Sequence, residues 1–311
     1  MLRRLLLAAS GSDRVRQLLT AAPYARGVVS RYVAGETAAD AVAVTRRLQA
    51  GGLRVTLDYL GEDTADKAAA AAVAAEYVTL LGRLAAEGLA AGGAAEVSVK
   101  PSAVGLGLPE HGEKTALEHI GRICSAARNA GTVVTLDMED HTHVDATLRL
   151  VRELRADYPD LGCVIQSQLR RAEADCGALA RPGSRVRLCK GAYSAPEDVA
   201  FPARHDVDRS YARCLRVLMT GRGYPMIATH DPRLLAIAAA QAQLAGRSPD
   251  SFEYQLLYGV RPDEQRRLAA GGARVRVYVP YGSDWYGYLV RRLAERPANL
   301  TFFLRSLASR G

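Results

Sequence analysis

Short apolar runs rich in β-branched residues recur along the chain, and amphipathic stretches separate them. Eight runs have the length and composition of strands, at residues 53–60, 95–100, 132–138, 162–168, 185–190, 224–229, 252–257 and 273–279. Apolar residues at helical spacing occupy most of the intervals, at 65–91, 117–130, 144–157, 206–219, 232–245 and, more briefly, 262–270. A strand–helix unit repeated in this way predicts a parallel sheet covered by helices.

The repeat favours a closed barrel over an open sheet. An open doubly wound sheet usually carries a G-x-G-x-x-G turn after its first strand, and none follows residues 53–60. The chain has 311 residues, of which 49% are apolar, and this suits one large α/β domain. We therefore expect a (βα)8 TIM-type barrel over residues 53–311, preceded by a helical N-terminal extension over residues 1–52. Within that extension a helix should end at Gly51-Gly52.

Charge and cysteine content narrow the class of partner. The formal net charge is +8, but the cations are scattered over helix faces without the aromatic platforms of a nucleic-acid surface. We expect no nucleic-acid partner, and attraction to anionic substrates or cofactors instead. The five cysteines are odd in number and lack metal-ligand spacing, which indicates a reducing, cytoplasmic compartment. No stretch reaches the roughly 20 apolar residues expected of a membrane span.

Polar residues gather where the predicted strands end, and this is where such a barrel places its active site. Seven of the eight runs carry them: Lys100, Asp137 beside Met138, Gln166 or Gln168, Arg187 with Lys190, Thr229-His230, Glu253 with Gln255, and Tyr278. This concentration predicts a site for a charged ligand. A lysine at a strand end, such as Lys100 or Lys190, can anchor an anion or act as a Schiff-base nucleophile.

The last predicted helix carries a second cationic signal. Tyr288, Arg291, Arg292 and Glu295 share one helical face, and the start of this helix should lie beside the mouth of the barrel. Two neighbouring guanidinium groups there could bind a carboxylate or phosphate, although a solvated face with salt bridges is the alternative. We expect no metal at the acidic, histidine-containing segment 137–143, because its histidines leave the strand for the start of a helix.

Seven segments resemble, in order and spacing, the proline dehydrogenase family. They are V-S-V-K-P-S (97–102), L-D-M-E (136–139), V-I-Q-S (164–167), R-L-C-K-G-A-Y (187–193), A-T-H (228–230), F-E-Y-Q (252–255) and Y-L-V-R-R-L-A-E (288–295). The resemblance covers roughly residues 50–305 and is closest to the monofunctional enzymes. It implies a barrel enzyme with non-covalently bound FAD that oxidises L-proline to Δ1-pyrroline-5-carboxylate. It also implies that the electrons pass on to a membrane quinone.

The resemblance assigns roles by position. Asp137 would organise the site, and Arg187 would lie close to the flavin N5. The residues implied for the substrate are Lys100, Tyr193, Tyr278, Arg291 and Arg292. Those implied for the cofactor are Met138, Gln166, Arg187, Lys190, Gly191, Ala192, Thr229, His230, Gln255 and Glu295.

Other functions remain open at this point. A Schiff-base lyase or aldolase of the same fold would use Lys190 and need no bound chromophore. A basic module that binds nucleic acid or a membrane surface would need no cluster at the strand ends. Arg3 and Arg4 beside Leu5-Leu6-Leu7 are compatible with a peripheral contact on the inner face of the cell membrane.

Overall fold

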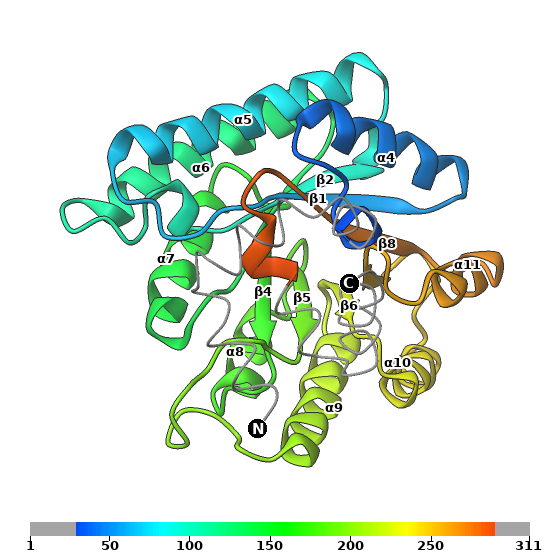
Figure 1. Ribbon diagram of the computed structural model, residues 1–311. Helices are drawn as coiled ribbons and strands as arrows, with labels where there is room; N and C mark the ends of the chain where they lie inside the picture. Colours follow the sequence, from blue (N-terminus) through cyan, green and yellow to red (C-terminus); the bar gives the residue numbers. More distant parts are fainter. Residues whose placement is uncertain (1–28, 290–311) are drawn as a thin grey trace, which may run out of the picture.

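Eight parallel strands close into a barrel in the computed structural model, which describes residues 29–289 (Figure 1). The strands are β1 (Arg54–Tyr59), β2 (Ala95–Val99), β3 (Val134–Leu136), β4 (Gly162–Gln166), β5 (Arg185–Cys189), β6 (Tyr224–Ala228), β7 (Glu253–Leu257) and β8 (Val275–Tyr281). Strand β8 pairs with β1, with Val55 opposite Val277, and this pairing closes the ring. The predicted barrel is confirmed, and each strand overlaps its predicted run.

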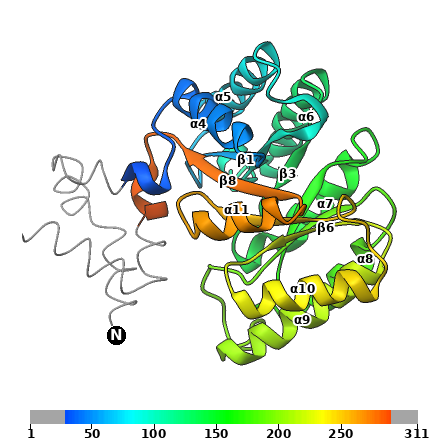
Figure 2. The same ribbon diagram turned by 90° about the vertical axis from the view of Figure 1, so that its right-hand side faces the viewer.

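Helices surround the strands on the outside (Figures 1 and 2). They are α4 (Ala38–Ala50), α5 (Lys67–Ala86), α6 (Gly112–Asn129), α7 (Val144–Leu154), α8 (Ala172–Leu179), α9 (Arg204–Thr220), α10 (Pro232–Leu244) and α11 (Pro262–Ala270), with short 3-10 turns η1 (Ala91–Gly93), η2 (Ser102–Val104) and η3 (His141–His143). Helix α6 begins earlier than expected because its first turn is polar. Helix α8 was not predicted, since it buries only Ala172 and Cys176 and has almost no apolar stripe.

Helix α4 covers the outer face of the barrel where the first and last strands meet. It packs on β1, β8 and α5, with Ala41, Val42 and Val44 buried (Figure 1). A capping box between Thr37 and Asp40 begins the helix. The predicted helix before residue 53 is confirmed, whereas the domain boundary between residues 52 and 53 stays a prediction.

Helix α5 meets, by length and composition alone, the requirement for a membrane span, contrary to the expectation from the sequence. In the structure it packs on β1, β2 and α6. The hydroxyl of its Tyr77 donates a hydrogen bond to the carbonyl of Ser98 at 2.8 Å and accepts one from the N–H of Tyr59 at 3.1 Å. These contacts tie α5 into the outer ring of the barrel.

Side chains along most strands alternate between an apolar outer layer and an interior that holds many polar groups. Outward residues such as Val55, Leu57 and Val97 join the core beneath the helices. Barrels of this type usually fill their interior with branched apolar side chains. Here many inward positions are buried and polar: Thr56, Asp58, Glu96, Ser98, Lys100, Thr135, Gln166, Arg187, Glu253, Gln255 and Arg276.

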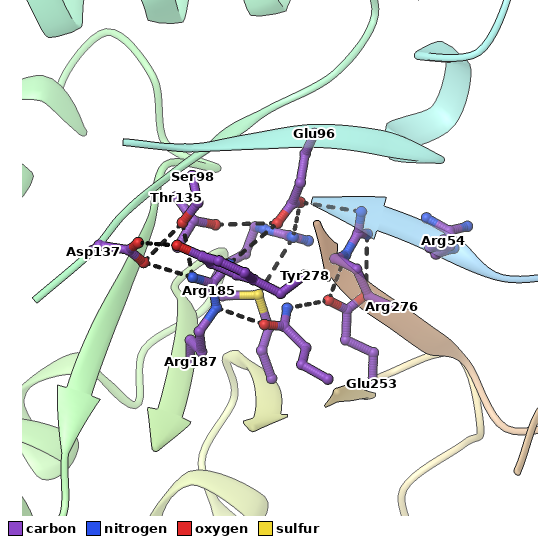
Figure 3. A network of polar contacts seen from close by, with 12 residues as sticks. Arg54, Glu96, Ser98, Thr135, Asp137, Arg185, Arg187, Glu253, Arg276 and Tyr278 are labelled. Carbon is purple, nitrogen blue, oxygen red and sulfur yellow. Dashed lines mark hydrogen bonds and ion pairs between the residues drawn. The ribbon is translucent and has the colours of Figure 1, made fainter. Parts of the chain in front are cut away.

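Arg276 is the central cation in the half of the interior nearer the N-terminal ends of the strands (Figure 3). Its Nε and Nη2 donate to Glu253 at 2.7 and 3.1 Å, and its Nη1 lies 3.6 Å from Glu96. Glu96 also accepts a hydrogen bond from Arg185 at 2.7 Å. Burial alone would raise the pKa of Glu253, but Arg276 lowers it to about 2. The carboxylate is therefore ionised at neutral pH although it is fully buried.

Replacing Arg276 should destabilise the fold strongly. Arg276→Met leaves Glu253 and Glu96 buried without their shared cation, and we expect the free energy of unfolding to fall by about 3–5 kcal/mol. The control is Arg54→Met, because the half-buried Arg54 donates, among residues 29–289, only to the carbonyls of Gly92 and Gly93; we expect a loss of about 1 kcal/mol there. Urea unfolding followed by circular dichroism measures both losses, and similar losses in the two variants would contradict this account.

Candidate functional site

A cavity of about 1050 Å³ opens at the C-terminal ends of the strands. This exceeds the roughly 300–1,000 Å³ of most small-molecule sites. Most of the residues predicted from the sequence line it: Asp137, Met138, Gln166, Arg187, Lys190, Gly191, Ala192, Tyr193, Thr229, His230, Gln255 and Tyr278. Lys100 is buried behind this lining, and Arg291, Arg292 and Glu295 lie outside the described residues 29–289.

Asp137, directly after β3, gathers donors from three strands. Its Oδ1 accepts hydrogen bonds from Ser98 Oγ at 2.8 Å and from Arg187 Nη1 at 2.7 Å. Its Oδ2 accepts one from the Tyr278 hydroxyl at 2.7 Å. Burial, together with the charge of Asp137, raises the pKa of Tyr278 well above its usual value, so the phenol keeps its proton and donates. Figure 3 shows these side chains converging from β2, β5 and β8.

The guanidinium of Arg187 is fixed from two further sides. Its Nε donates to Gln255 Oε1 at 2.5 Å, and its Cζ lies 5.3 Å from the centre of the Tyr278 ring. Gln255 in turn donates from Nε2 to Glu253 Oε1 at 2.6 Å, which determines which end of its amide faces Arg187. The site thus contains an oriented cation on the wall of a cavity.

Lys100 pairs with Asp58 across the first two strands, with Nζ 2.5 Å from Oδ1. Burial would lower the pKa of Lys100, but Asp58 and Asp137 raise it above its usual value, so the amine stays charged. Asp58 was missed in the sequence analysis and is the immediate partner of this lysine. A contact between Lys100 and a substrate carboxylate stays a prediction.

Gln166, the last residue of β4, lines the cavity and carries a buried hydrogen-bond acceptor. Its Nε2 donates to the carbonyls of Met138 at 2.8 Å and Glu139 at 2.9 Å, which fixes the orientation of the amide. Its Oε1 is buried and has no hydrogen-bond partner within the described part of the chain. An unpaired buried acceptor costs about 1–3 kcal/mol, so this atom suits a ligand that carries an N–H group.

The first turns of α9 and α10 border another part of the cavity, and Figure 2 shows the two helices side by side. No side chain in the described part of the chain caps the first turn of α9, so its N–H groups can bind an anion. Lys190 lies in the same region, with Nζ 2.6 Å from Asp208 and 3.1 Å from Asp231. Lys190 therefore forms ion pairs with both helices at this edge of the cavity.

His230 and Gly191 shape the loops around the cavity. Nε2 of His230 accepts a hydrogen bond from the N–H of Leu257 at 2.9 Å, so that nitrogen carries no proton. Gly191 has a φ of +100°, and a Cβ there would lie 2.4 Å from Cδ of Gln168. Gln168 donates from Nε2 to the carbonyl of Tyr193 at 3.0 Å and so ties the loop after β5.

Several residues of this region were not found from the sequence. Asp58 and Ser98 occupy alternate positions inside apolar strands, and this alternation was the available signal. Tyr32 lines the cavity although it precedes the first strand. Glu62 follows β1, and its Oε1 accepts a hydrogen bond from the Tyr193 hydroxyl at 3.2 Å. No periodic pattern in the sequence marks these last two.

Comparison with known proteins gives consistent matches. The family model described as "Proline dehydrogenase" matches residues 41–305. Proline dehydrogenase 1 of Bacillus subtilis is 38% identical over 277 residues, which cover 89% of each chain. Proline dehydrogenase of Deinococcus radiodurans is 38% identical over 282 residues, which cover 90% of each chain.

A solved structure gives the same answer for the fold. Proline utilization A from Bdellovibrio bacteriovorus superposes with a TM-score of 0.79 at 25% identity, over 87% of this chain. This chain spans only 33% of that larger protein.

The fold and the cavity first define the class of protein to which the chain belongs. A (βα)8 barrel with its ligand cavity and a buried charge cluster at the C-terminal ends of the strands has the architecture of a barrel enzyme. The matches then specify the family: the chain belongs to the proline dehydrogenase family of oxidoreductases. The resemblance inferred from the sequence motifs is thereby confirmed.

Substituting Gly191 should separate backbone strain from crowding. Gly191→Ala both strains the backbone and displaces Gln168, whereas Gly183→Ala strains the backbone alone, because Gly183 has a φ of +77° and open space around its Cβ position. We expect Gly191→Ala to cost about 1–3 kcal/mol more than Gly183→Ala, the usual range for overpacking. Urea unfolding of both variants measures this, and equal losses would mean that Gln168 moves without cost.

Proposed function

We propose that this protein oxidises L-proline to Δ1-pyrroline-5-carboxylate in proline catabolism, with non-covalently bound FAD as hydride acceptor and a membrane quinone as final electron acceptor. Proline oxidation follows from the family. The observation that supports a flavin most directly is Gln166, which lines a large cavity and whose buried Oε1 has no hydrogen-bond partner among residues 29–289. The imide N–H of a flavin ring is the kind of donor that this oxygen lacks.

When bound, FAD supplies a flat electron sink for the hydride that leaves the proline carbon next to nitrogen. Arg187 holds a positive charge on the cavity wall, and Asp137 and Gln255 keep it in place before any ligand arrives. Such a preoriented cation stabilises negative charge that develops beside it. The first turn of α9, near Lys190, offers N–H groups suited to the phosphates.

The residues proposed to bind the substrate are those predicted from the sequence. Lys100, Arg291 and Arg292 supply cations for the proline carboxylate, and three cations around one carboxylate would fix the reacting carbon in position. Tyr278 and Tyr193 line the cavity and would contact the ring. We also propose a cytoplasmic location with peripheral contact on the inner face of the membrane, because the proposed quinone lies in the membrane.

A bound flavin gives the first test of this function. The purified protein should be yellow, release FAD rather than FMN on denaturation, and lose its flavin absorbance when L-proline is added anaerobically. Absorbance spectroscopy and chromatography of the released cofactor measure this. A colourless protein that also fails to bind added FAD would contradict the proposal.

A matched pair of variants ties the flavin to Gln166. Gln166→Leu should weaken FAD binding about 10-fold, the effect of losing one hydrogen bond of roughly 1.4 kcal/mol. Gln265→Leu is the control, because Gln265 also donates from Nε2 to two carbonyls, those of Leu257 and Val260. Equal weakening in both would mean that lost carbonyl contacts, rather than Oε1, explain the effect.

The arginine pair tests the substrate. Arg291→Met and Arg292→Met keep most of the aliphatic packing but remove charge-assisted hydrogen bonds to the carboxylate. We expect kcat/KM for proline to fall about 30-fold to several thousand-fold, equivalent to roughly 2–5 kcal/mol, with FAD content retained. A change below a few-fold in both variants would instead indicate a solvated helix face, where ion pairs contribute about 0–1 kcal/mol.

A further inference from the structure

We propose that Ser102 and Glu139 act as positioning residues that hold the loop between β1 and α5 across the mouth of the barrel. This Ser102–Glu139 pair, here called the clamp, keeps Glu62 against Tyr193. The proposal rests on the proposed function in one respect, since it takes Tyr193 to be part of the proline site. Its structural basis is a continuous set of hydrogen bonds from the buried Ser102 and Glu139 to the loop after β1.

The contact between Glu62 and Tyr193 spans the barrel mouth. Glu62 follows β1, Tyr193 follows β5, and these strands lie opposite one another in the closed eight-stranded ring. The 3.2 Å hydrogen bond from the Tyr193 hydroxyl to Glu62 therefore joins loops from opposite sides. We call this contact the bridge. Whatever holds the loop after β1 also holds the side of the cavity that Tyr193 lines.

Ser102 of η2 binds this loop through three hydrogen bonds. Its Oγ accepts from the N–H of Asp63 at 3.1 Å. Its carbonyl accepts from the N–H of Thr64 at 3.4 Å and from the Thr64 hydroxyl at 3.1 Å. Ser102 itself is fully buried, so solvent offers these groups no replacement.

Glu139 determines the direction of the Ser102 hydroxyl. Ser102 donates from Oγ to Glu139 Oε1 at 2.5 Å and from its N–H to Oε2 at 2.8 Å. Because the single hydroxyl proton points to Glu139, the lone pairs of Oγ are left for the N–H of Asp63. The carbonyl of Glu139 is held in turn by Gln166 on the cavity wall, so the clamp connects that wall to the loop.

The loop stores backbone strain that the clamp offsets. Asp63 has a φ of +51°, in the left-handed region. Residues other than glycine adopt this conformation at a cost, although aspartate does so more readily than most. The hydrogen bond from its N–H to Ser102 favours the strained form, and without that bond Asp63 should relax and withdraw Glu62 from Tyr193. Glycine at position 63 would adopt the same conformation without the cost.

The experiment uses the flavin-loaded enzyme in three variants: Ser102→Ala, Ser102→Ala with Asp63→Gly, and Ser184→Ala. Ser184→Ala is the control. Ser184 is a buried serine directly before β5, at the opposite end of the barrel, and its hydroxyl accepts a hydrogen bond from Arg155. We expect Ser102→Ala to raise the proline KM about 10-fold, equivalent to roughly 1.4 kcal/mol. FAD content and kcat should change less than about 2-fold, and the amides of residues 61–64 should exchange with deuterium faster. Adding Asp63→Gly to Ser102→Ala should return the KM most of the way to the wild-type value, while Ser184→Ala should leave KM unchanged.

Specific outcomes would overturn the clamp. The first is a proline KM that Ser102→Ala leaves unchanged. The second is an equal increase in KM in Ser184→Ala. The third is a double variant, Ser102→Ala with Asp63→Gly, whose KM stays as high as that of Ser102→Ala alone. If Ser102→Ala does not fold, Thr64→Val removes one bond to Ser102 and should still raise both KM and the exchange of residues 61–64; no change in either would equally overturn the proposal. Failure of the proposed function would appear separately, as a wild-type enzyme whose flavin is not bleached by proline. The exchange measurements would then still decide whether the clamp holds the loop.

Discussion

The ion pair between Arg276 and Glu253 lies inside the barrel, where no solvent reaches either charge. The same constraint applies to the other charged groups of the barrel interior. Removing a charge from water costs several kcal/mol, so each interior charge must meet a partner from another strand. Glu96 meets Arg185, and Lys100 meets Asp58. This need also fixes the register of the strands, because a slip of one residue would bring charges under the helices and apolar side chains into the interior.

The same network orients the functional site from within the barrel. Glu253 directs the amide of Gln255, Gln255 holds Nε of Arg187, and Arg187 binds Asp137. The groups on the cavity wall are thus set by contacts that reach toward the far end of the strands. A site built this way needs little reorganisation when a ligand arrives, which is the condition for electrostatic stabilisation.

The sequence predicted the barrel because its strands are marked by β-branched apolar runs, and it located the cavity because strand ends converge in this fold. The sequence did not reveal which of the charged residues pair with one another. Asp137 and Arg187 are 50 residues apart, and Lys100 and Asp58 are 42 apart, so only the closed ring brings them together. Helix α8 escaped prediction because so little of it is buried. The role of Arg291, beyond the described residues, still rests on motif and helical spacing.

Closure by α4 and β8 also bears on how the chain is made. Helix α4 and strand β1 are synthesised before the other strands of the barrel, yet both pack against β8, more than two hundred residues later. Until β8 leaves the ribosome, β1 presents an unpaired edge that could join another chain. Contacts so distant along the chain slow folding, because loop closure must precede the interactions that reward it. An unpaired strand edge of this kind makes an incomplete barrel prone to aggregate.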